Sequence, residues 1–186
     1  MPISNLGLLV SGESDKQALT ELARKHLPSA RINARTVNGP LKGKIVKTLK
    51  IFQYDGHNYD RVIVVDDSDG KDPSAKKQRL IDDVGSRTFP FELSYLVIVQ
   101  ELETWLLADE NALTKVSQDR GGTPISRISG TLEEIQSPKE LLIRALESAG
   151  AGPYVTETAR KIAEQSDVDR ILARCPGYKE FSDALS

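Results

Sequence analysis

The chain has 186 residues, a length that suits one globular domain and is short for two. Hydrophobic residues make up 39% and charged residues 28%, as in an ordinary water-soluble globule. A formal net charge of −2 excludes a uniformly basic nucleic-acid coat. A local basic surface stays open, because binding depends on how the charge is distributed.

Several features of the sequence indicate the compartment. No apolar run approaches the roughly 20 residues that a membrane span needs, so we expect no membrane partner. The first residues lack the basic region and the cleavage site of a secretory signal. The lone cysteine, Cys175, has no second cysteine for an internal disulfide, which favours a reducing compartment. Together these features predict a cytoplasmic protein.

Short apolar runs alternate with helical patterns in the first half of the chain. Residues 6–10, LGLLV, form a continuous apolar run typical of a buried parallel strand. The helix after it is predicted to begin at Ser14, which resembles a capping box with Gln17. A weaker strand is predicted within residues 30–38, and residues 45–52 show the spacing of a second helix.

The clearest strand is residues 61–67, RVIVVDD, a β-branched run that ends in acidic residues. Asp72 followed by Pro73 is typical of a helix N-cap with proline at the first helical position, and this helix is predicted to reach about Val84. Residues 94–100 form the fourth predicted strand. Strands that alternate with helices at this spacing predict a mainly parallel, four-stranded sheet in an α/β fold, with the first and third strands adjacent.

The second half of the chain shows helical patterns and no confident strand. Ser137 followed by Pro138 begins a clear helix, and further helical spacing follows it. We therefore expect an α/β core over residues 1–110. A helical extension over residues 111–186 is expected to pack on that core, and not to form an independent domain.

Carboxylates follow three of the predicted strands: Glu13 and Asp15 after the first, Asp66, Asp67 and Asp69 after the third, and Glu101 and Glu103 after the fourth. Ligands of parallel α/β sheets gather beyond the carboxyl ends of the strands, so these side chains are expected at one edge. Like charges there repel one another, and a divalent cation relieves the repulsion. Oxygen ligands without a histidine or cysteine cluster favour Mg²⁺ or Mn²⁺ over zinc. Because Mg²⁺ recruits phosphate oxygens, the pattern indicates phosphoryl or nucleotidyl chemistry.

Each acidic residue also has a structural interpretation. Residues 67–70, Asp-Ser-Asp-Gly, make a good turn unaided. Asp66 can point to the other face, since side chains alternate along a strand. Asp72 is better explained as a helix cap than as a ligand. Asp15 lies in the first turn of a helix, where the dipole favours a carboxylate.

The remaining reactive side chains carry less weight. His26 and His57 are far apart in the sequence and lack the spacing of metal ligands. Cys175 precedes a proline and is expected to be a packed small hydrophobe. The lysines of residues 42–50 and 71–77 are more typical of a solvated face, so they support nucleic-acid binding only slightly.

Five segments of the chain resemble a known family: NGPLKGKIVKTL, VVDDSDGKD, VQELETWLLAD, SPKELL and RCPGYKEF. They are similar to a prokaryotic family of Toprim-like proteins, related to the Toprim domains of topoisomerases, primases and overcoming-lysogenization-defect nucleases. Members are often encoded beside ATPases of the ABC or AAA type. The resemblance covers nearly the whole chain and implies a Toprim-like, Rossmannoid core with a helical C-terminal extension.

The resemblance also implies roles for single residues. In Toprim proteins a D-x-D pair after the third strand binds magnesium, and Asp67 and Asp69 match that pair. The family has a glutamate at the end of the first strand, before a glycine, that acts as general acid or base. That position here is Ser11, so Glu13 is the residue expected to take over the role. Glu101 and Glu103 are expected to bind a second metal or to shape the first site, and Glu103 is equally well explained as a residue at the start of a helix.

Two functions from different classes follow from the resemblance. The first is a nuclease-like enzyme, dependent on Mg²⁺ or Mn²⁺, that cleaves nucleic-acid phosphodiesters with an ATPase partner in defence or DNA maintenance. The alternative is a catalytically degenerate binding module that regulates or scaffolds the ATPase. The serine at position 11 favours the module, whereas the retained D-x-D pair favours the enzyme. An aspartyl-nucleophile phosphatase is disfavoured, because that chemistry places D-x-D after the first strand.

Overall fold

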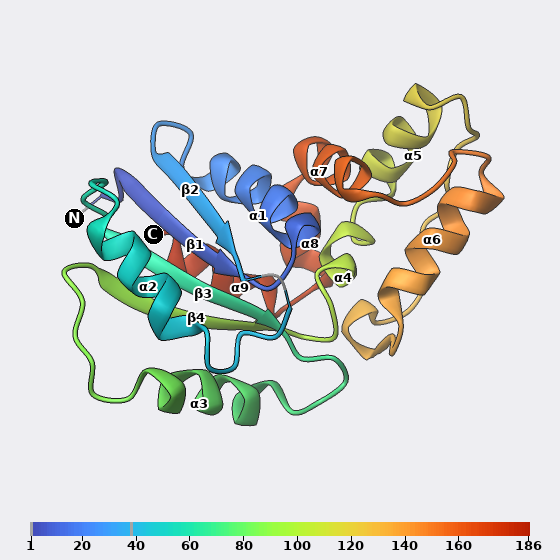
Figure 1. Cartoon of the computed structure of the whole chain (residues 1–186). Helices are drawn as coiled ribbons and strands as arrows, with labels where there is room; N and C mark the ends of the chain where they lie inside the picture. The colour runs from blue at the N-terminus through green and yellow to red at the C-terminus, as the bar shows by residue number, and fades with distance from the viewer. Residues whose placement is uncertain (1, 38) are drawn as a thin grey trace.

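The computed structural model describes residues 2–37 and 39–186, so residue 38, at the end of the strand predicted within residues 30–38, lies outside it. Within the described residues, four parallel strands form one sheet in the order β2-β1-β3-β4 (Figure 1). The strands are β1 (Asn5–Val10), β2 (Arg31–Thr36), β3 (Arg61–Asp67) and β4 (Glu92–Ile98). The predicted α/β fold, with its first and third strands adjacent, is confirmed.

The central strand β1 is buried on both faces of the sheet. Leu8 and Val10 contribute to the apolar core on one face, and Leu9 contributes to the core on the other. Gly7 lies beside β3 where a side chain has no room, since a Cβ atom there would come within 2.9 Å of Val62 Cγ2. A continuous apolar run in the sequence therefore reflects two covered faces.

The fourth strand ends earlier than the prediction over residues 94–100. It finishes at Ile98, and Gln100 has a φ of 64°, in the left-handed region that an extended strand does not use. This turn of the backbone at Gln100 brings the chain from the sheet into the short helix α4 (Glu103–Leu106). The predicted strand was too long at this end because an apolar pattern does not show where the backbone turns into the left-handed region.

Helices cover both faces of the sheet (Figure 1). The helix α1 (Glu13–His26) packs on the face that carries Leu8, whereas α2 (Ile45–Tyr54) and α3 (Pro73–Val84) pack on the face that carries Leu9. The predicted start of α3 is confirmed: the Asp72 side chain accepts a hydrogen bond from the backbone N–H of Ser74 at 2.9 Å. On both faces, a helix that follows a strand begins at the carboxyl edge of the sheet.

The helical extension consists of α4 and then α5 (Glu110–Asp119), α6 (Pro138–Ser148), α7 (Thr156–Gln165), α8 (Val168–Arg174) and α9 (Tyr178–Ala184), with a 3-10 turn at Leu132–Glu134. Its apolar side chains join those of one sheet face in a continuous core cluster. Trp105 is fully buried there, with its ring centroid 4.8 Å from that of Tyr178, and Cys175 is buried nearby. The extension thus shares a core with the sheet, and the boundary at residue 110 stays a prediction.

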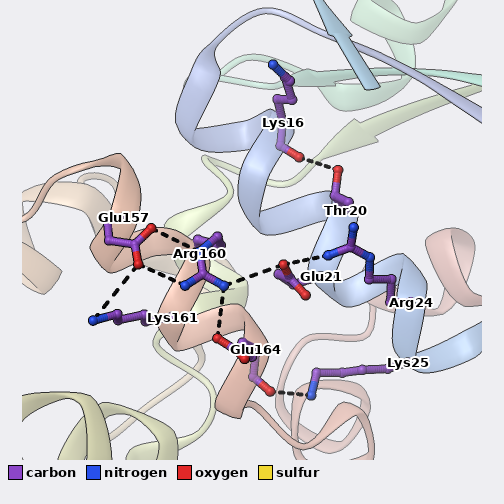
Figure 2. A network of polar contacts seen from close by, with 9 residues as sticks. All are labelled: Lys16, Thr20, Glu21, Arg24, Lys25, Glu157, Arg160, Lys161 and Glu164. Carbon is purple, nitrogen blue, oxygen red and sulfur yellow. Dashed lines mark hydrogen bonds and ion pairs between the residues drawn. The ribbon is translucent and has the colours of Figure 1, made fainter. Parts of the chain in front are cut away.

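Polar contacts join α1 to α7 at the surface (Figure 2). Arg160 of α7 lies 2.8 Å from Glu157 and 3.0 Å from Glu164 on its own helix, and 3.7 Å from Glu21 on α1. Lys25 of α1 donates to the backbone carbonyl of Glu164 at 2.7 Å. Salt screens such exposed pairs, so the apolar contacts beneath them contribute most of the stability. The network orients α7 on α1, the helix whose first turn reaches the carboxyl edge of the sheet.

Across residues 2–37 and 39–186, the helices are all too short or too polar to cross a membrane.

Candidate functional site

The last two residues of β3 are aspartates that face opposite sides of the sheet. Asp66 faces α3, where its Oδ2 lies 3.1 Å from Nζ of Lys76. Asp67 faces α1 and α4, and its strongest carboxylate neighbours are Asp15 and Glu103. This split agrees with the alternation expected along a strand. The carboxylates at this edge therefore form two neighbouring groups.

Asp67 is the centre of the first group. Burial raises the pKa of Asp67 well above its usual value, and repulsion from Asp15, then from Glu103 and Asp69, raises it further. Burial likewise raises the pKa of Glu103, whose residue is only 4% exposed. Carboxylates from the ends of three structural segments thus meet with too little positive charge to balance them.

Asp15 reaches this group through the turn between β1 and α1. Its Oδ2 accepts hydrogen bonds from Ser11 Oγ and from the backbone N–H of Gly12, each at 3.1 Å. The N-cap is Gly12, two residues before the predicted cap at Ser14, and Asp15 closes the first turn in place of Gln17. An acceptor in the first helical turn is favoured by the free N–H groups there.

Glu13 lies elsewhere than the sequence argument expected. Its carboxylate is exposed and contacts Lys16 Nζ at 3.0 Å and Gln17 Nε2 at 2.9 Å, both on its own helix. The acidic residue of this turn that acts on Asp67 is Asp15. The expected approach of Glu13 to Asp67 is therefore corrected: a residue at the first position of the helix points away from the sheet edge, and one two positions later points toward it.

Glu101 and Glu103 also have different surroundings. Glu103 Oε1 accepts a hydrogen bond from the hydroxyl of Tyr154 at 2.9 Å. Glu101 Oε2 accepts from the backbone N–H of Lys139, at the start of α6, at 3.1 Å. Glu103 thus belongs to the Asp67 group, whereas Glu101 ties the loop after β4 to the helical extension.

The turn between Asp67 and Asp69 is fixed to the end of β4. The buried Ser68 accepts a hydrogen bond from the backbone N–H of Gln100 on its Oγ at 2.7 Å, and the N–H of Asp69 donates to the Gln100 carbonyl at 2.9 Å. Asp69 has a φ of 50°, which is uncommon outside glycine and is tolerated best by aspartate and asparagine. The backbone therefore holds both aspartates of the D-x-D pair in one defined arrangement.

A pocket of about 930 Å³ opens beside these residues, between the β1–α1 turn and α3. Its acidic wall includes Asp66, Asp67 and Asp69. Its basic lining comes from Lys42, Lys71, Lys76 and Arg79. Asp82 and Asp83 line it as well, so carboxylates and cations are mixed around the pocket. Such a lining suits a ligand that combines a metal ion with phosphate groups.

Comparison with known proteins places the chain in a family. A family model described as a domain of unknown function (DUF4276) matches residues 10–186. The chain belongs to the DUF4276 family. No curated protein matches the sequence.

Solved structures similar to this DUF4276 chain come from OLD proteins. The C-terminal region of the Burkholderia pseudomallei OLD protein is 15% identical, with a TM-score of 0.52 over 99% of each chain. The C-terminal region of the Xanthomonas campestris pv. campestris OLD protein is 16% identical, with a TM-score of 0.48 over 96% of each chain. At such identity the likeness concerns the fold alone. The predicted Toprim-like fold, related to the overcoming-lysogenization-defect family, is confirmed.

The donor chemistry of the DUF4276 site fits a hard divalent cation. Asp15, Asp67 and Glu103 offer carboxylate oxygens, and no histidine or cysteine takes part in the contacts described above. Among residues 2–37 and 39–186, however, no group of three or more acidic, histidine or cysteine side chains already has the geometry of a metal site. Their mutual repulsion is the feature that a cation would relieve, and side-chain rotation is required to bind it.

The sequence indicated three further residues of this site to different degrees. Asp15 was one of the acids after the first strand and was explained by the helix dipole, and Lys76 was one of the lysines expected on a solvated face. Tyr154 carried no signal, since it meets Glu103 only through the packing of the segment before α7. Burial raises the pKa of the Cys175 thiol to about 12, which fits the packed role predicted for it.

Proposed function

We propose that the protein is a nuclease-like domain that uses Mg²⁺ or Mn²⁺ to cleave nucleic-acid phosphodiesters. The observation that carries this proposal is the meeting of Asp67, Asp15 and Glu103 at the carboxyl edge of the sheet, beside a pocket lined by both carboxylates and cations. Parallel α/β sheets place ligands at this edge. The Toprim-like fold supports the assignment of the D-x-D pair as metal ligands.

In this proposal Asp67 and Asp69 hold the cation, with Asp15 and Glu103 completing its oxygen surroundings. When bound, the cation supplies Lewis-acid polarisation of the phosphodiester. Lys42, Lys71 and Arg79 attract and orient the phosphate backbone through charge, as basic side chains do in nucleic-acid grooves. The chain's own residues thus position the substrate and concentrate negative charge where the cation binds.

The carboxylate that takes part in proton transfer is Asp15 in this proposal, in place of Glu13. Asp15 faces the Asp67 group, and Ser11, at the position of the family glutamate, hydrogen-bonds to it. A general base must reach the attacking water directly or through one bridging water. Glu13, paired with Lys16 and Gln17 on the outer side of the helix, does not meet that requirement.

The test is a cleavage assay of the purified protein on single-stranded DNA, nicked DNA and RNA with Mn²⁺ or Mg²⁺. We expect weak cleavage, dependent on Mn²⁺, that the double substitution Asp67→Asn with Asp69→Asn abolishes. Asp183→Asn serves as the control, because Asp183 pairs with Lys179 on the exposed surface of α9. Cleavage that persists in the double variant, or without any divalent ion, rules the proposal out.

The second candidate is a binding module that serves an ABC- or AAA-type ATPase, as the resemblance of the sequence implies. Ser11, in place of the strand-end glutamate, favours it, because a serine is too short and too weakly basic to act as that glutamate does. Inactivity of the wild type and of Ser11→Glu on every substrate, alone and with the ATPase encoded beside it, favours the module. Activity that rises in Ser11→Glu favours an impaired enzyme.

A further inference from the structure

Lys76 forms the second group at this edge together with Asp66 and Asp69. Its Nζ lies 3.1 Å from Asp66 Oδ2 and 3.2 Å from Asp69 Oδ2, and it also donates to the backbone carbonyl of Asp67. An ammonium group has three N–H donors, and here it has three oxygen partners, one each from Asp66, Asp67 and Asp69. The side chains of Lys76 and Asp66 are 18% and 14% exposed, so that pair is largely shielded from water, whereas the Asp69 side chain is 57% exposed.

The start of α3 fixes Lys76 in this place. Asp72 caps the helix through the N–H of Ser74, and its carbonyl accepts the backbone N–H of Lys76 at 3.0 Å. The next residue, Lys77, reaches in another direction and contacts Glu180 on α9. A helix that begins directly after the D-x-D turn therefore directs one lysine back onto that turn.

We propose that Lys76 is a resident counter-cation that competes with the divalent metal for Asp69. The inference rests on the proposed function, because it assigns Asp69 to the metal. While Lys76 holds Asp69, the metal loses one ligand, so the free protein binds Mn²⁺ weakly. A phosphate group in the pocket offers the ammonium another anionic partner and releases Asp69. Metal and phosphodiester then bind with positive coupling, which is reciprocal by thermodynamic necessity.

The experiment measures the Mn²⁺ dissociation constant of the full chain by titration calorimetry and by electron paramagnetic resonance. Replacing Lys76 by Met is expected to tighten Mn²⁺ binding by roughly two- to fivefold, the change that loss of a competing, partly exposed ion pair produces. Lys76→Arg retains a competing cation and should bind Mn²⁺ about as weakly as the wild type. A short single-stranded DNA should tighten Mn²⁺ binding in the wild type more than in Lys76→Met.

Two controls separate this role from general charge and from folding. Lys77→Met removes one positive charge from the neighbouring position of the same helix, where the lysine contacts Glu180 on α9, and should change Mn²⁺ affinity by less than twofold. The double variant Asp66→Asn with Lys76→Met leaves no unpaired carboxylate at position 66 and so guards against unfolding. It should bind Mn²⁺ at least as tightly as the wild type.

The outcomes distinguish the two proposals. If the wild type binds Mn²⁺ and Lys76→Met binds it no more tightly, or if Lys77→Met tightens it equally, the competition is overturned while the metal site stands. If neither the wild type nor any Lys76 variant binds Mn²⁺, the proposed function and the role of Lys76 are both overturned.

Discussion

Ser11 Oγ donates a hydrogen bond to Oδ2 of Asp15 at 3.1 Å, so the residue at the end of β1 holds the carboxylate of the first helical turn. The backbone N–H of Gly12 donates to the same oxygen. The negative charge that the Toprim-like family places at the strand end is therefore found one helical turn later, directed toward Asp67. This displacement decides which acidic residue of the β1–α1 turn belongs to the site.

The first prediction compares the two acidic residues of this turn. Asp15→Asn should abolish most of the rise in Tm that Mn²⁺ produces, because a ligand that binds only the folded state stabilises it by mass action. Glu13→Gln is the matched control and should retain the full rise, since Glu13 pairs with Lys16 and Gln17. Differential scanning fluorimetry with and without Mn²⁺ measures both. The opposite ranking of the two variants would return the role to Glu13.

The second prediction concerns the charge on Asp67 without metal. Asp67→Asn removes a carboxylate that burial and its neighbours disfavour, so the metal-free protein should become more stable. The gain is on the order of 1 kcal/mol, roughly 2–4 °C in Tm for a chain of this length. Thermal unfolding in a chelating buffer at neutral pH measures it. A lower Tm in Asp67→Asn would show that Asp67 is stabilised by its surroundings and would contradict the electrostatic description of the site.

The third prediction concerns Tyr154, whose hydroxyl donates to Glu103 Oε1 at 2.9 Å. Tyr154→Phe keeps the ring and removes the donor, so it should destabilise the fold by roughly 1–3 kcal/mol, the cost of leaving a buried charged acceptor unpaired. Chemical denaturation measures this change. Mn²⁺ affinity should fall as well, because Glu103 loses the contact that orients it. An additional Glu103→Gln substitution should make the loss of Tyr154 less costly.

Most of the fold was predictable because it depends on local patterns. The strand over residues 61–67, the cap at Asp72 and the end of its helix at Val84 follow from β-branched runs and from capping preferences, and each is confirmed. The left-handed turn at Gln100 was not predictable. It depends on Ser68 and Asp69, which reach it across the sheet edge from another strand.

Only the part of the site that follows from the order and direction of the strands was predictable. A parallel sheet brings the ends of β1, β3 and β4 together whatever the side chains are, and this is why the acids after those strands were predicted to lie at one edge. The direction of each side chain changes with a shift of one or two positions along the chain. Glu13 pairs along the outer side of its helix, whereas Asp15, two residues later, faces the Asp67 group. The partners Lys76 and Tyr154 arrive through tertiary packing, which no spacing in the sequence encodes.

The last prediction concerns His26, at the end of α1, whose Nε2 lies 2.9 Å from the hydroxyl of Tyr178. Burial lowers the pKa of His26 below its usual 6.5, although Asp169 opposes the shift. The unfolded chain therefore takes up this proton first as the pH falls. The contribution of His26 to stability should be present above pH 6.5 and lost as the pH falls from there through the pKa of the folded state.

His26→Gln tests this sign, because glutamine does not titrate. The free energy of unfolding should be measured for both proteins between about pH 5 and 8, and the difference between the curves isolates His26. Taking the difference matters because the raised pKa values of Asp67 and Glu103 act the other way, adding stability as the pH falls. Tyr178→Phe removes the same hydrogen bond and leaves the imidazole. It should therefore change the free energy of unfolding by a similar amount at every pH. A difference between wild type and His26→Gln that does not shrink on acidification would show that His26 is not held neutral by burial.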